Sequence, residues 1–381
     1  MKTFVRLTAL ALALVFCVAG FAACNGTGDK VILIGGSGPL TGANSQYGSA
    51  VLNGAKLAVE EINAKGGYNG YTFELDMKQD DCGTTQAENA YYALEEAGMK
   101  ISIGSVTSGS AKAFADAARE DNLFCLTPSA SADNVIASGN HSFRVCFGDP
   151  QQGTLAADEL VTNKGFAKIG VIYDNSDDYS TGLYQAFEAR MTALNKVKGT
   201  DYVVYTFDSD NKVDFNQQVT GIKNAGCDAI FLPIYYAEAA LIAKSAATFE
   251  ETKNLPILGC DGLDGIAAQL DSSVVAEVRY FTPFDINSTE TNVKTFVEKY
   301  REAYGLDPNQ FAADAYDAVM IIYEALVAGE IDVEGTASEI CNALAAQLTG
   351  GTFKYSGLTG DNMTWTTDGA VVKEAKIVKV Q

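Results

Sequence analysis

The sequence is poor in the residues that enzymes use for acid–base and metal chemistry. Its 381 residues include one histidine, His141, and no two cysteines have the CxxC spacing of a metal or redox site. Ser–His–Asp and Cys–His nucleophilic sites and histidine-rich zinc sites are therefore not supported. We expect His141 to have a structural or surface role, and we expect no enzyme activity, no cofactor and no metal site.

Positive charge is also scarce, with 27 Lys and Arg against 48 Asp and Glu. Without residues 1–23, which contain two basic residues and no acidic one, the net charge is 25 − 48 = −23. Such an acidic body argues against nucleic acid or an anionic membrane surface as a partner. No apolar run after residue 24 reaches membrane length, and about 357 residues are too many for one ordinary core, so two domains are predicted.

The first 24 residues have the pattern of a secretory signal. A short basic start is followed by the uncharged, mostly apolar run Leu7–Ala23, by Cys24 and by a polar stretch. Phe21-Ala22-Ala23-Cys24 resembles the lipobox of bacterial lipoproteins. The alternative is an uncleaved membrane helix, but 17 residues are few to cross ~30 Å of hydrocarbon. We predict a signal peptide over 1–23, a lipidated Cys24, a tether over 24–30 and an extracytoplasmic protein held on the bacterial cell membrane by this lipid.

Six further cysteines are present, and an exported chain permits disulfides. Their connectivity cannot be deduced from the sequence. Two of the six, Cys125 and Cys146, lie within apolar runs, where a buried thiol is expected. The full set is Cys82, Cys125, Cys146, Cys227, Cys260 and Cys341.

Short apolar runs alternate with amphipathic ones along the chain, which indicates parallel sheets flanked by helices. Val31–Ile34 is predicted as a strand and Tyr47–Ala64 as a helix with its apolar residues on one stripe. The alternation begins again at Lys168, after a crossover near Gly148-Asp149-Pro150. Further strands are predicted at Tyr71–Met77, Ile101–Ile103, Leu123–Leu126, Lys168–Tyr173, Tyr202–Phe207, Ala229–Leu232, Leu255–Leu258, Val278–Phe281 and Val371–Val380.

The predicted fold class is therefore α/β, with two flavodoxin-like lobes joined by several crossovers. The helical runs Val293–Tyr304 and Ala312–Val327 have no place in the second series, so we expect them to return to the first lobe. The predicted boundaries are 31–148 plus 283–365 for the first lobe. The second lobe is predicted to comprise 149–282 plus 366–381.

Two motifs that would indicate other chemistry fail on inspection. The glycine-rich segment after the first strand has Thr41 where a dinucleotide loop starting at Gly36 needs its third glycine. The adjacent acids Asp80-Asp81 and Asp177-Asp178 could suggest paired-carboxylate chemistry, but we predict that they lie in solvated loops at strand ends.

Small hydroxyl residues follow two successive strands of the first lobe. They occupy the segments Ser105–Ser110 and Thr127–Asp133. Ligands of parallel α/β sheets bind beyond the carboxyl ends of the strands, and a helix N-terminus with a serine is suited to a carboxylate. Plain helix capping is the alternative for each segment alone. Together, the two segments predict a site for a small anion.

These segments belong to a set of motifs that resembles the branched-chain amino acid (Leu/Ile/Val) type of periplasmic substrate-binding protein of ABC transporters. The resemblance covers nearly the whole chain after residue 30. It depends on motifs in the same order and spacing, which are Gly38-Pro39-Leu40-Thr41-Gly42, Gln46-Tyr47-Gly48, Ala58 through Gly67, Ile103 through Ser108, Thr127 through Ser131 and Gly259-Cys260-Asp261-Gly262.

The resemblance implies a role for each matching residue of the cleft. Ser108 would bind the ligand's α-carboxylate, while Ser129 and Ser131, with Ala130 between them, would contact the amino-acid head. From the second lobe, Asp261 would pair with the α-ammonium. The cleft aromatics implied by the resemblance are Tyr47, Tyr179 and Tyr235.

Two departures from the family pattern limit what the resemblance implies. Thr107 stands where some members have a cysteine that pairs with the equivalent of Cys82, so that bridge cannot form. Asp261 replaces a longer Glu of some members. The ligand is expected to be a free amino acid, most simply an aliphatic one. The alternatives are another small polar ligand (amide, urea or aromatic acid), an enzyme acting on a small carbonyl substrate, and a chemosensory module.

The family also implies partners. We expect a membrane permease with its cytoplasmic ATPase, and we expect the binding protein itself to be a monomer.

Overall fold

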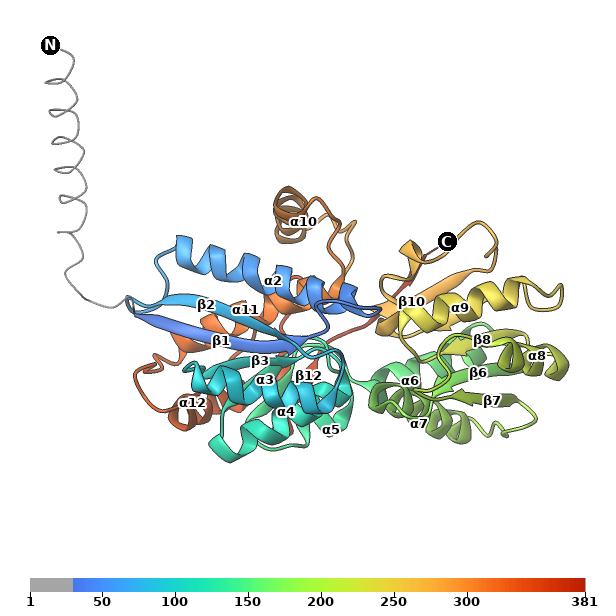
Figure 1. Ribbon diagram of the computed structural model, residues 1–381, viewed down its shortest axis with the longest axis horizontal. Helices are drawn as coiled ribbons and strands as arrows, with labels where there is room; N and C mark the ends of the chain where they lie inside the picture. Colours follow the sequence, from blue (N-terminus) through green and yellow to red (C-terminus); the bar gives the residue numbers. More distant parts are fainter. Residues whose placement is uncertain (1–29, 381) are drawn as a thin grey trace, which may run out of the picture.

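The computed structural model describes residues 30–380. Two β-sheets, each with helices on both faces, lie at opposite ends of an elongated molecule (Figure 1). We call the part around the five-stranded sheet the first lobe and the part around the six-stranded sheet the second lobe. The predicted signal peptide and Cys24 lie outside the described residues. Within 30–380 no helix is long and apolar enough to cross a membrane.

The sheet of the first lobe is parallel throughout and has the strand order β2-β1-β3-β4-β5. Ile34 of β1 pairs with Leu75 on one side and Ile101 on the other, so β1 lies inside the sheet. The strands are β1 (Val31–Gly38), β2 (Thr72–Gln79), β3 (Ile101–Ser105), β4 (Phe124–Thr127) and β5 (Ser142–Arg144), and the helices between them are α2 (Ser45–Ala64), α3 (Thr84–Glu96), α4 (Ser108–Asp121) and α5 (Asp133–Ile136).

The sheet of the second lobe has the order β13-β10-β9-β8-β6-β7, and only its edge strand β13 is antiparallel. Its strands are β6 (Ile169–Asp174), β7 (Tyr202–Phe207), β8 (Ala229–Leu232), β9 (Ile257–Gly259), β10 (Val278–Thr282) and β13 (Lys376–Lys379). Its helices are α6 (Asp149–Ala157), which a π-helical turn continues to Asn163, and α7 (Asp178–Ala193), α8 (Asn216–Ala225) and α9 (Tyr236–Ala247). The sequence analysis did not predict α9.

The structure confirms the helix that was predicted from the apolar stripe of α2. The stripe residues Val51, Ala55 and Ile62 are all buried, as their 3.6-residue spacing predicts. At Gly54 a β-carbon would lie 2.0 Å from the carbonyl oxygen of Ala312, so the backbones of α2 and α11 (Gln310–Ala328) are in direct contact. This contact fixes a C-terminal helix against the first lobe.

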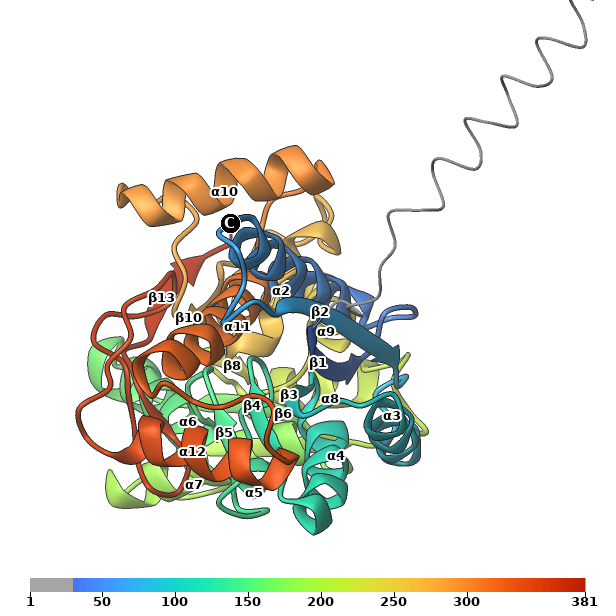
Figure 2. The ribbon, with the colours of Figure 1, turned by 90° about the vertical axis from the view of Figure 1, so that its left-hand side faces the viewer.

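The remaining C-terminal elements also pack on the first lobe. Helix α10 (Thr291–Tyr304) lies over α2 (Figure 2), where Lys299 Nζ is 2.9 Å from Glu61 Oε1. Helix α12 (Ala337–Thr349) packs on β3 and β4. Strands β11 (Thr364–Trp365) and β12 (Val371–Val372) form a hairpin. Trp365 attaches this hairpin to the first lobe, because its Nε1 donates to the carbonyl of Arg144 at 2.9 Å. The chain thus passes between the sheets after β5, after β10 and after β12. The residue boundaries of the lobes stay a prediction.

The predicted strand Val371–Val380 is wrong over its first half. Residues 371–372 pair with β11 in the first lobe, and only Lys376–Lys379 joins the second sheet. Between them the ammonium of Lys373 is buried and donates to Asp314 Oδ1 (2.7 Å), Thr359 Oγ1 (2.8 Å) and the carbonyl of Val145 (2.9 Å). This buried ion pair holds the start of the third crossover in the first lobe.

None of the six cysteines in the described range forms a disulfide, and five of them are buried. Cys125 and Cys146 are among the buried ones, as predicted. Cys82 is half-buried, and its thiol accepts a hydrogen bond from Asn44 Nδ2 at 3.5 Å. The fold therefore does not depend on a disulfide within this range.

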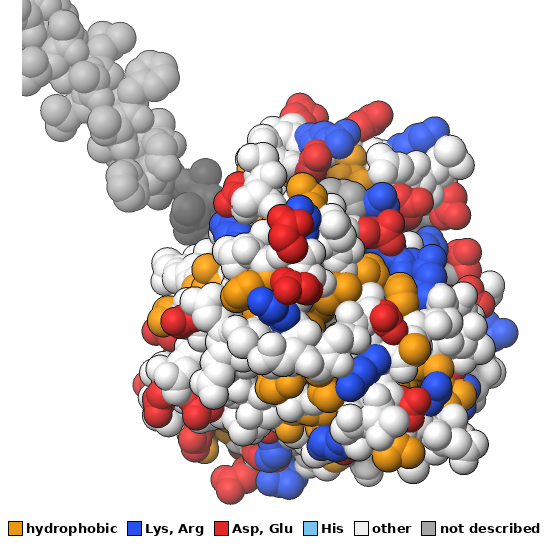
Figure 3. Space-filling model, turned by 90° about the vertical axis from the view of Figure 1, so that its right-hand side faces the viewer, with side chains coloured by type: hydrophobic (Ala, Val, Ile, Leu, Met, Phe, Trp, Pro, Cys, Tyr) orange, Lys and Arg blue, Asp and Glu red, His pale blue; other side chains and the backbone are white. Residues whose placement is uncertain are grey.

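Charged side chains of both signs are interspersed over the end of the second lobe (Figure 3). The acidic excess of the chain is therefore not concentrated into one patch on this face.

Candidate functional site

The first lobe presents a helix N-terminus and a serine to the space between the sheets. Ser108 is the first residue of α4, and only 2% of its surface is exposed. The first N–H groups of a helix have no partners within the helix and carry a partial positive charge. In the next loop Thr127 Oγ1 accepts from the N–H of Ala130 at 3.1 Å and donates to the carbonyl of Ser105 at 3.0 Å, which fixes the turn that carries Ser129. This end of the site is suited to an anion.

The second lobe presents a buried carboxylate from the segment after β9. Asp261 is 2% exposed, and its Oδ1 accepts from Tyr179 Oη at 2.7 Å and from the N–H of Gly262 at 2.9 Å. Burial raises the pKa of Asp261 to about 7, while the hydrogen bonds lower it. No ion pair of the described residues includes Asp261, so this end of the site is suited to a cation.

Aromatic rings form the wall between the two ends. Tyr47 of α2 packs against Phe311 and Tyr235 with ring centroids 4.9 and 5.6 Å apart, and Tyr235 stacks on Tyr179 at 5.0 Å. The hydroxyl of Tyr47 donates to the carbonyl of Gly262 at 2.5 Å and accepts from the N–H of Tyr236 at 3.0 Å. Tyr47 therefore connects the first lobe to the second across the site.

These groups surround a small cavity between the lobes. Its volume is about 20 Å³, which corresponds to about one water molecule. An amino acid can therefore enter only after the lobes separate or the lining side chains move. The lining residues are Tyr47, Val106, Thr107, Ser108, Ser129, Tyr179, Tyr235, Asp261, Gly262 and Phe311.

Six of the eight residues predicted for the site line this cavity. The other two, Ala130 and Ser131, lie behind the wall and are buried to 1% and 0% exposure. Four lining residues were not predicted. Val106, Thr107 and Gly262 each lie within two positions of a predicted residue in the sequence. Phe311 lies about 200 positions from Ser108 and approaches it only because α11 packs on α2.

Asp80 and His141 are both buried and hydrogen-bonded. The predicted solvated position is wrong for Asp80, which is 0% exposed and accepts from the hydroxyls of Ser37 (2.9 Å) and Ser105 (2.5 Å) at the ends of β1 and β3. The prediction of a structural role is confirmed for His141, which is buried with Nε2 2.8 Å from the carbonyl of Ala115. No group of three or more potential metal ligands occurs within residues 30–380.

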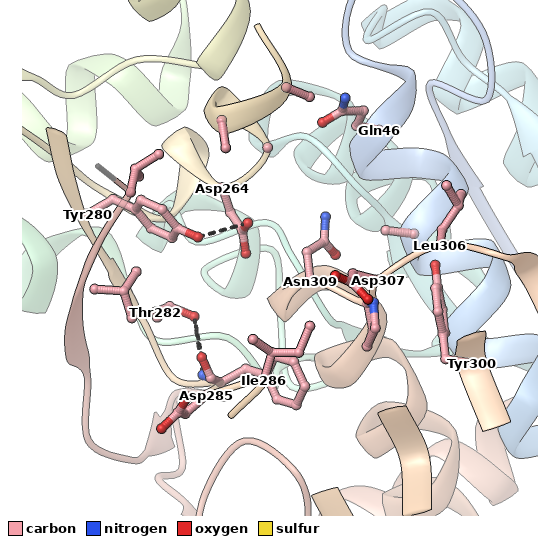
Figure 4. A pocket seen from close by; sticks show the side chains of 18 of the residues that line it. Gln46, Asp264, Tyr280, Thr282, Asp285, Ile286, Tyr300, Leu306, Asp307 and Asn309 are labelled. Atoms are coloured by element: carbon pink, nitrogen blue, oxygen red, sulfur yellow. Dashed lines mark hydrogen bonds between the residues drawn. The ribbon is translucent and has the colours of Figure 1, made fainter. Parts of the chain in front are cut away.

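A larger groove of about 710 Å³ lies between α2, the segment after β9 and the crossover after β10 (Figure 4). Asp264 points into it but is already hydrogen-bonded to Tyr280 Oη (2.9 Å) and to the N–H of Gln310 at the start of α11 (3.0 Å). Asp307 is ion-paired with Arg301. The groove is larger than the cavity at Asp261, but these carboxylates already have partners.

Comparison with known proteins gives a consistent result over nearly the whole chain. A family model described as periplasmic binding protein matches residues 31–381. The Leu/Ile/Val-binding protein homolog 3 of Brucella melitensis is 29% identical over 353 residues, covering 92% of this chain and 94% of that protein.

Solved structures agree with the fold. The branched-chain amino acid transporter substrate-binding protein LivJ of Streptococcus pneumoniae, in complex with isoleucine, has a TM-score of 0.80 at 27% identity, covering 91% of this chain and 95% of that one. A solute-binding protein of an ABC transporter from R. palustris, in complex with benzoate, has a TM-score of 0.79 at 19% identity, covering 92% and 93%. The second likeness concerns the fold alone.

Proposed function

Because the chain belongs to the periplasmic binding protein family, whose members are solute-binding proteins and not enzymes, we propose that it captures a free α-amino acid between its lobes. Family membership implies an extracytoplasmic location. The amino acid would then be delivered to the membrane permease of an ABC importer, powered by a cytoplasmic ATPase. Cys24 would carry the lipid that holds the protein on the membrane.

One observation carries the proposal, namely that the two ends of the cavity have opposite electrostatic character. The N-terminus of α4 with Ser108 offers N–H and O–H donors, and Asp261 in the other lobe offers a carboxylate without a cation. A zwitterion between them would neutralise both ends at once, and buried charges are tolerated under that condition. The aromatic wall would then contact an apolar side chain.

The proposal also includes hinge motion, since the cavity of about 20 Å³ is smaller than an amino acid and Tyr47 connects the lobes. The lobes would open about the three crossovers and close on the ligand. A branched-chain or other aliphatic side chain is supported by the similarity to proteins named for leucine, isoleucine and valine.

An aromatic acid is the second candidate, because a structural neighbour is a benzoate complex and the wall holds several tyrosine rings. Calorimetric titration of the full mature chain with the twenty amino acids and with benzoate separates the two. We expect saturable binding of one or more aliphatic amino acids. Binding of benzoate with no binding of any amino acid would refute the proposal.

A further inference from the structure

Three buried side chains beside Asp261 have polar atoms without hydrogen-bond partners. They are the hydroxyl of Ser131, both carboxylate oxygens of Asp149 and the side-chain nitrogen of Gln152, counted over the described residues. The three residues are 0%, 1% and 0% exposed. Folded proteins leave few buried polar groups unpaired, so each case needs a reason.

These side chains are connected to Asp261 and to both lobes. Gln152 lies in α6 of the second lobe, where its Oε1 accepts from the N–H of Asp261 at 2.9 Å. Asp149 begins the same helix, and its N–H donates to the carbonyl of Ser131 in the first lobe at 3.0 Å. A β-carbon at Gly182 would lie 2.6 Å from Asp149 Oδ2, so helix α7 packs directly against this carboxylate.

The surroundings of Asp149 contain little positive charge to balance it. The cation whose charge acts on Asp149 is Arg144, which makes its ion pair with Asp133 at 2.9 Å and donates to the carbonyl of Ser131 at 2.8 Å, while its Nε has no hydrogen-bond partner. Neither Asp149 nor Asp261 takes part in an ion pair within residues 30–380. The titratable and charged groups around Asp149 are Asp261 and Cys260 after β9, Tyr179 of α7, Tyr235 before α9, Arg144 of β5 and Asp133 of α5.

Two neighbouring buried carboxylates without an ion pair are costly. Burial raises the pKa of Asp149 well above its usual value. The nearby Ser131 hydroxyl and the charge of Arg144 lower this pKa, and the charges of Asp261 and Asp133 raise it further. The Ser131 hydroxyl is close to Asp149 but makes no hydrogen bond of ordinary geometry with it. A ligand ammonium next to Asp261 would supply the missing charge to both carboxylates.

We propose that Asp149, with Gln152 and Ser131, is a second acidic group at the ammonium end of the cleft, and that the cleft accepts only ligands that bring a positive charge there. Asp149 does not line the cavity, so it is a positioning and charge-balancing residue that acts through Asp261 and Ser131. This inference depends on the proposed function, because it concerns the same cleft. A cleft of this kind would bind α-amino acids and would not bind plain aromatic acids or 2-hydroxy acids.

The test compares the wild type with Asp149→Asn, which keeps the shape of the side chain and removes its charge. Each protein is titrated with leucine, isoleucine and valine, with their 2-hydroxy analogues and with benzoate. We expect the wild type to bind the amino acids and not the other acids. In Asp149→Asn we expect at least about a tenfold loss of amino acid affinity, which corresponds to 1.4 kcal/mol, and a smaller preference over the 2-hydroxy acids.

A second measurement distinguishes this role from a merely structural one. Ligand binding should release protons from the acidic pair, and calorimetry in buffers of different ionisation enthalpy counts them. We expect fewer protons released in Asp149→Asn than in the wild type. The control is Asp210→Asn on an exposed loop of the second lobe, which should change neither affinity nor proton release.

If Asp149→Asn does not fold, Gly182→Ala provides a second variant, because its methyl group would displace the Asp149 carboxylate. Unchanged amino acid affinity and unchanged proton release in a folded variant would overturn this inference and leave the proposed function intact. If the wild type binds benzoate and no amino acid, the proposed function fails, and the inference fails with it.

Discussion

Replacing Asp261 by Asn should stabilise the unliganded protein and weaken its binding of amino acids. The Asn side chain can still accept the hydrogen bonds that Tyr179 and Gly262 donate to Oδ1. The variant loses the carboxylate of Asp261, and burial raises the pKa of this carboxylate from 3.8 to about 7. Because the unfolded chain ionises this group more easily than the folded chain does, the wild type loses stability as pH rises from about 4 to about 7.

The size of the effect follows from the shift in pKa. The rise of the Asp261 pKa from 3.8 to about 7 corresponds to up to roughly 4 kcal/mol of stability. The full difference between Asp261→Asn and the wild type should therefore appear above pH 7 and become small at pH 4, and it should vanish at lower pH, where the carboxyl group is protonated in both states. The Asp261→Asn protein should therefore be more stable without ligand but should bind a cationic group less tightly, because the Asn side chain has no negative charge.

Two measurements check this prediction. Denaturant unfolding at pH 4, 6 and 8 gives the free energy of unfolding for each protein, and calorimetric titration at pH 8 gives the affinity for amino acids. An Asp261→Asn protein that is no more stable than the wild type at pH 8 would refute the reasoning from burial. An unchanged amino acid affinity would show that Asp261 does not pair with the ammonium.

Three further predictions address the rest of the proposal. Ser108→Ala removes one hydroxyl donor to a charged group and keeps the backbone N–H groups of α4, so it should cost ~1.5–3 kcal/mol of binding. The loss in Asp261→Ala should be larger, ~3–5 kcal/mol, and calorimetry would contradict this order if Ser108→Ala were the weaker binder. Cys24→Ala should release the protein from membranes or leave the signal uncleaved, and unchanged processing and attachment on a blot of membrane fractions would count against lipidation. A chain ending at residue 282 should lack a folded first lobe because α11 is missing, and an unfolding transition as cooperative as that of the full chain would contradict the predicted lobes.

Much of the fold could be predicted because local patterns and packing agree. The stripe of α2 and the buried strands depend on neighbours in the sequence, and the structure has most of these elements within a few residues of the predicted bounds. The segment that carries Ser108 was predicted in the same way, since ligands bind beyond the carboxyl ends of parallel strands. Asp261 was predicted only through the resemblance to a known family.

The remaining features depend on contacts that no local pattern contains. Phe311 joins the aromatic wall because α11 contacts α2 at Gly54, and a helical pattern does not reveal its partner. Lys373 interrupts the predicted last strand because its ammonium is paired with Asp314, 59 positions away in the sequence. Asp80 was expected in solvent, but serines from two other strands satisfy its carboxylate.

The absence of disulfides among residues 30–380 has a consequence for how the protein reaches its native state outside the cytoplasm. Six thiols must enter an oxidising compartment, where an unfolded chain can form incorrect bridges within seconds to hours. Five of them are buried in the folded protein, and burial raises the pKa of the Cys125, Cys227 and Cys341 thiols, so few reactive thiolates remain once the lobes have formed. Folding therefore competes with oxidation, and burial protects five of the six thiols in the folded protein.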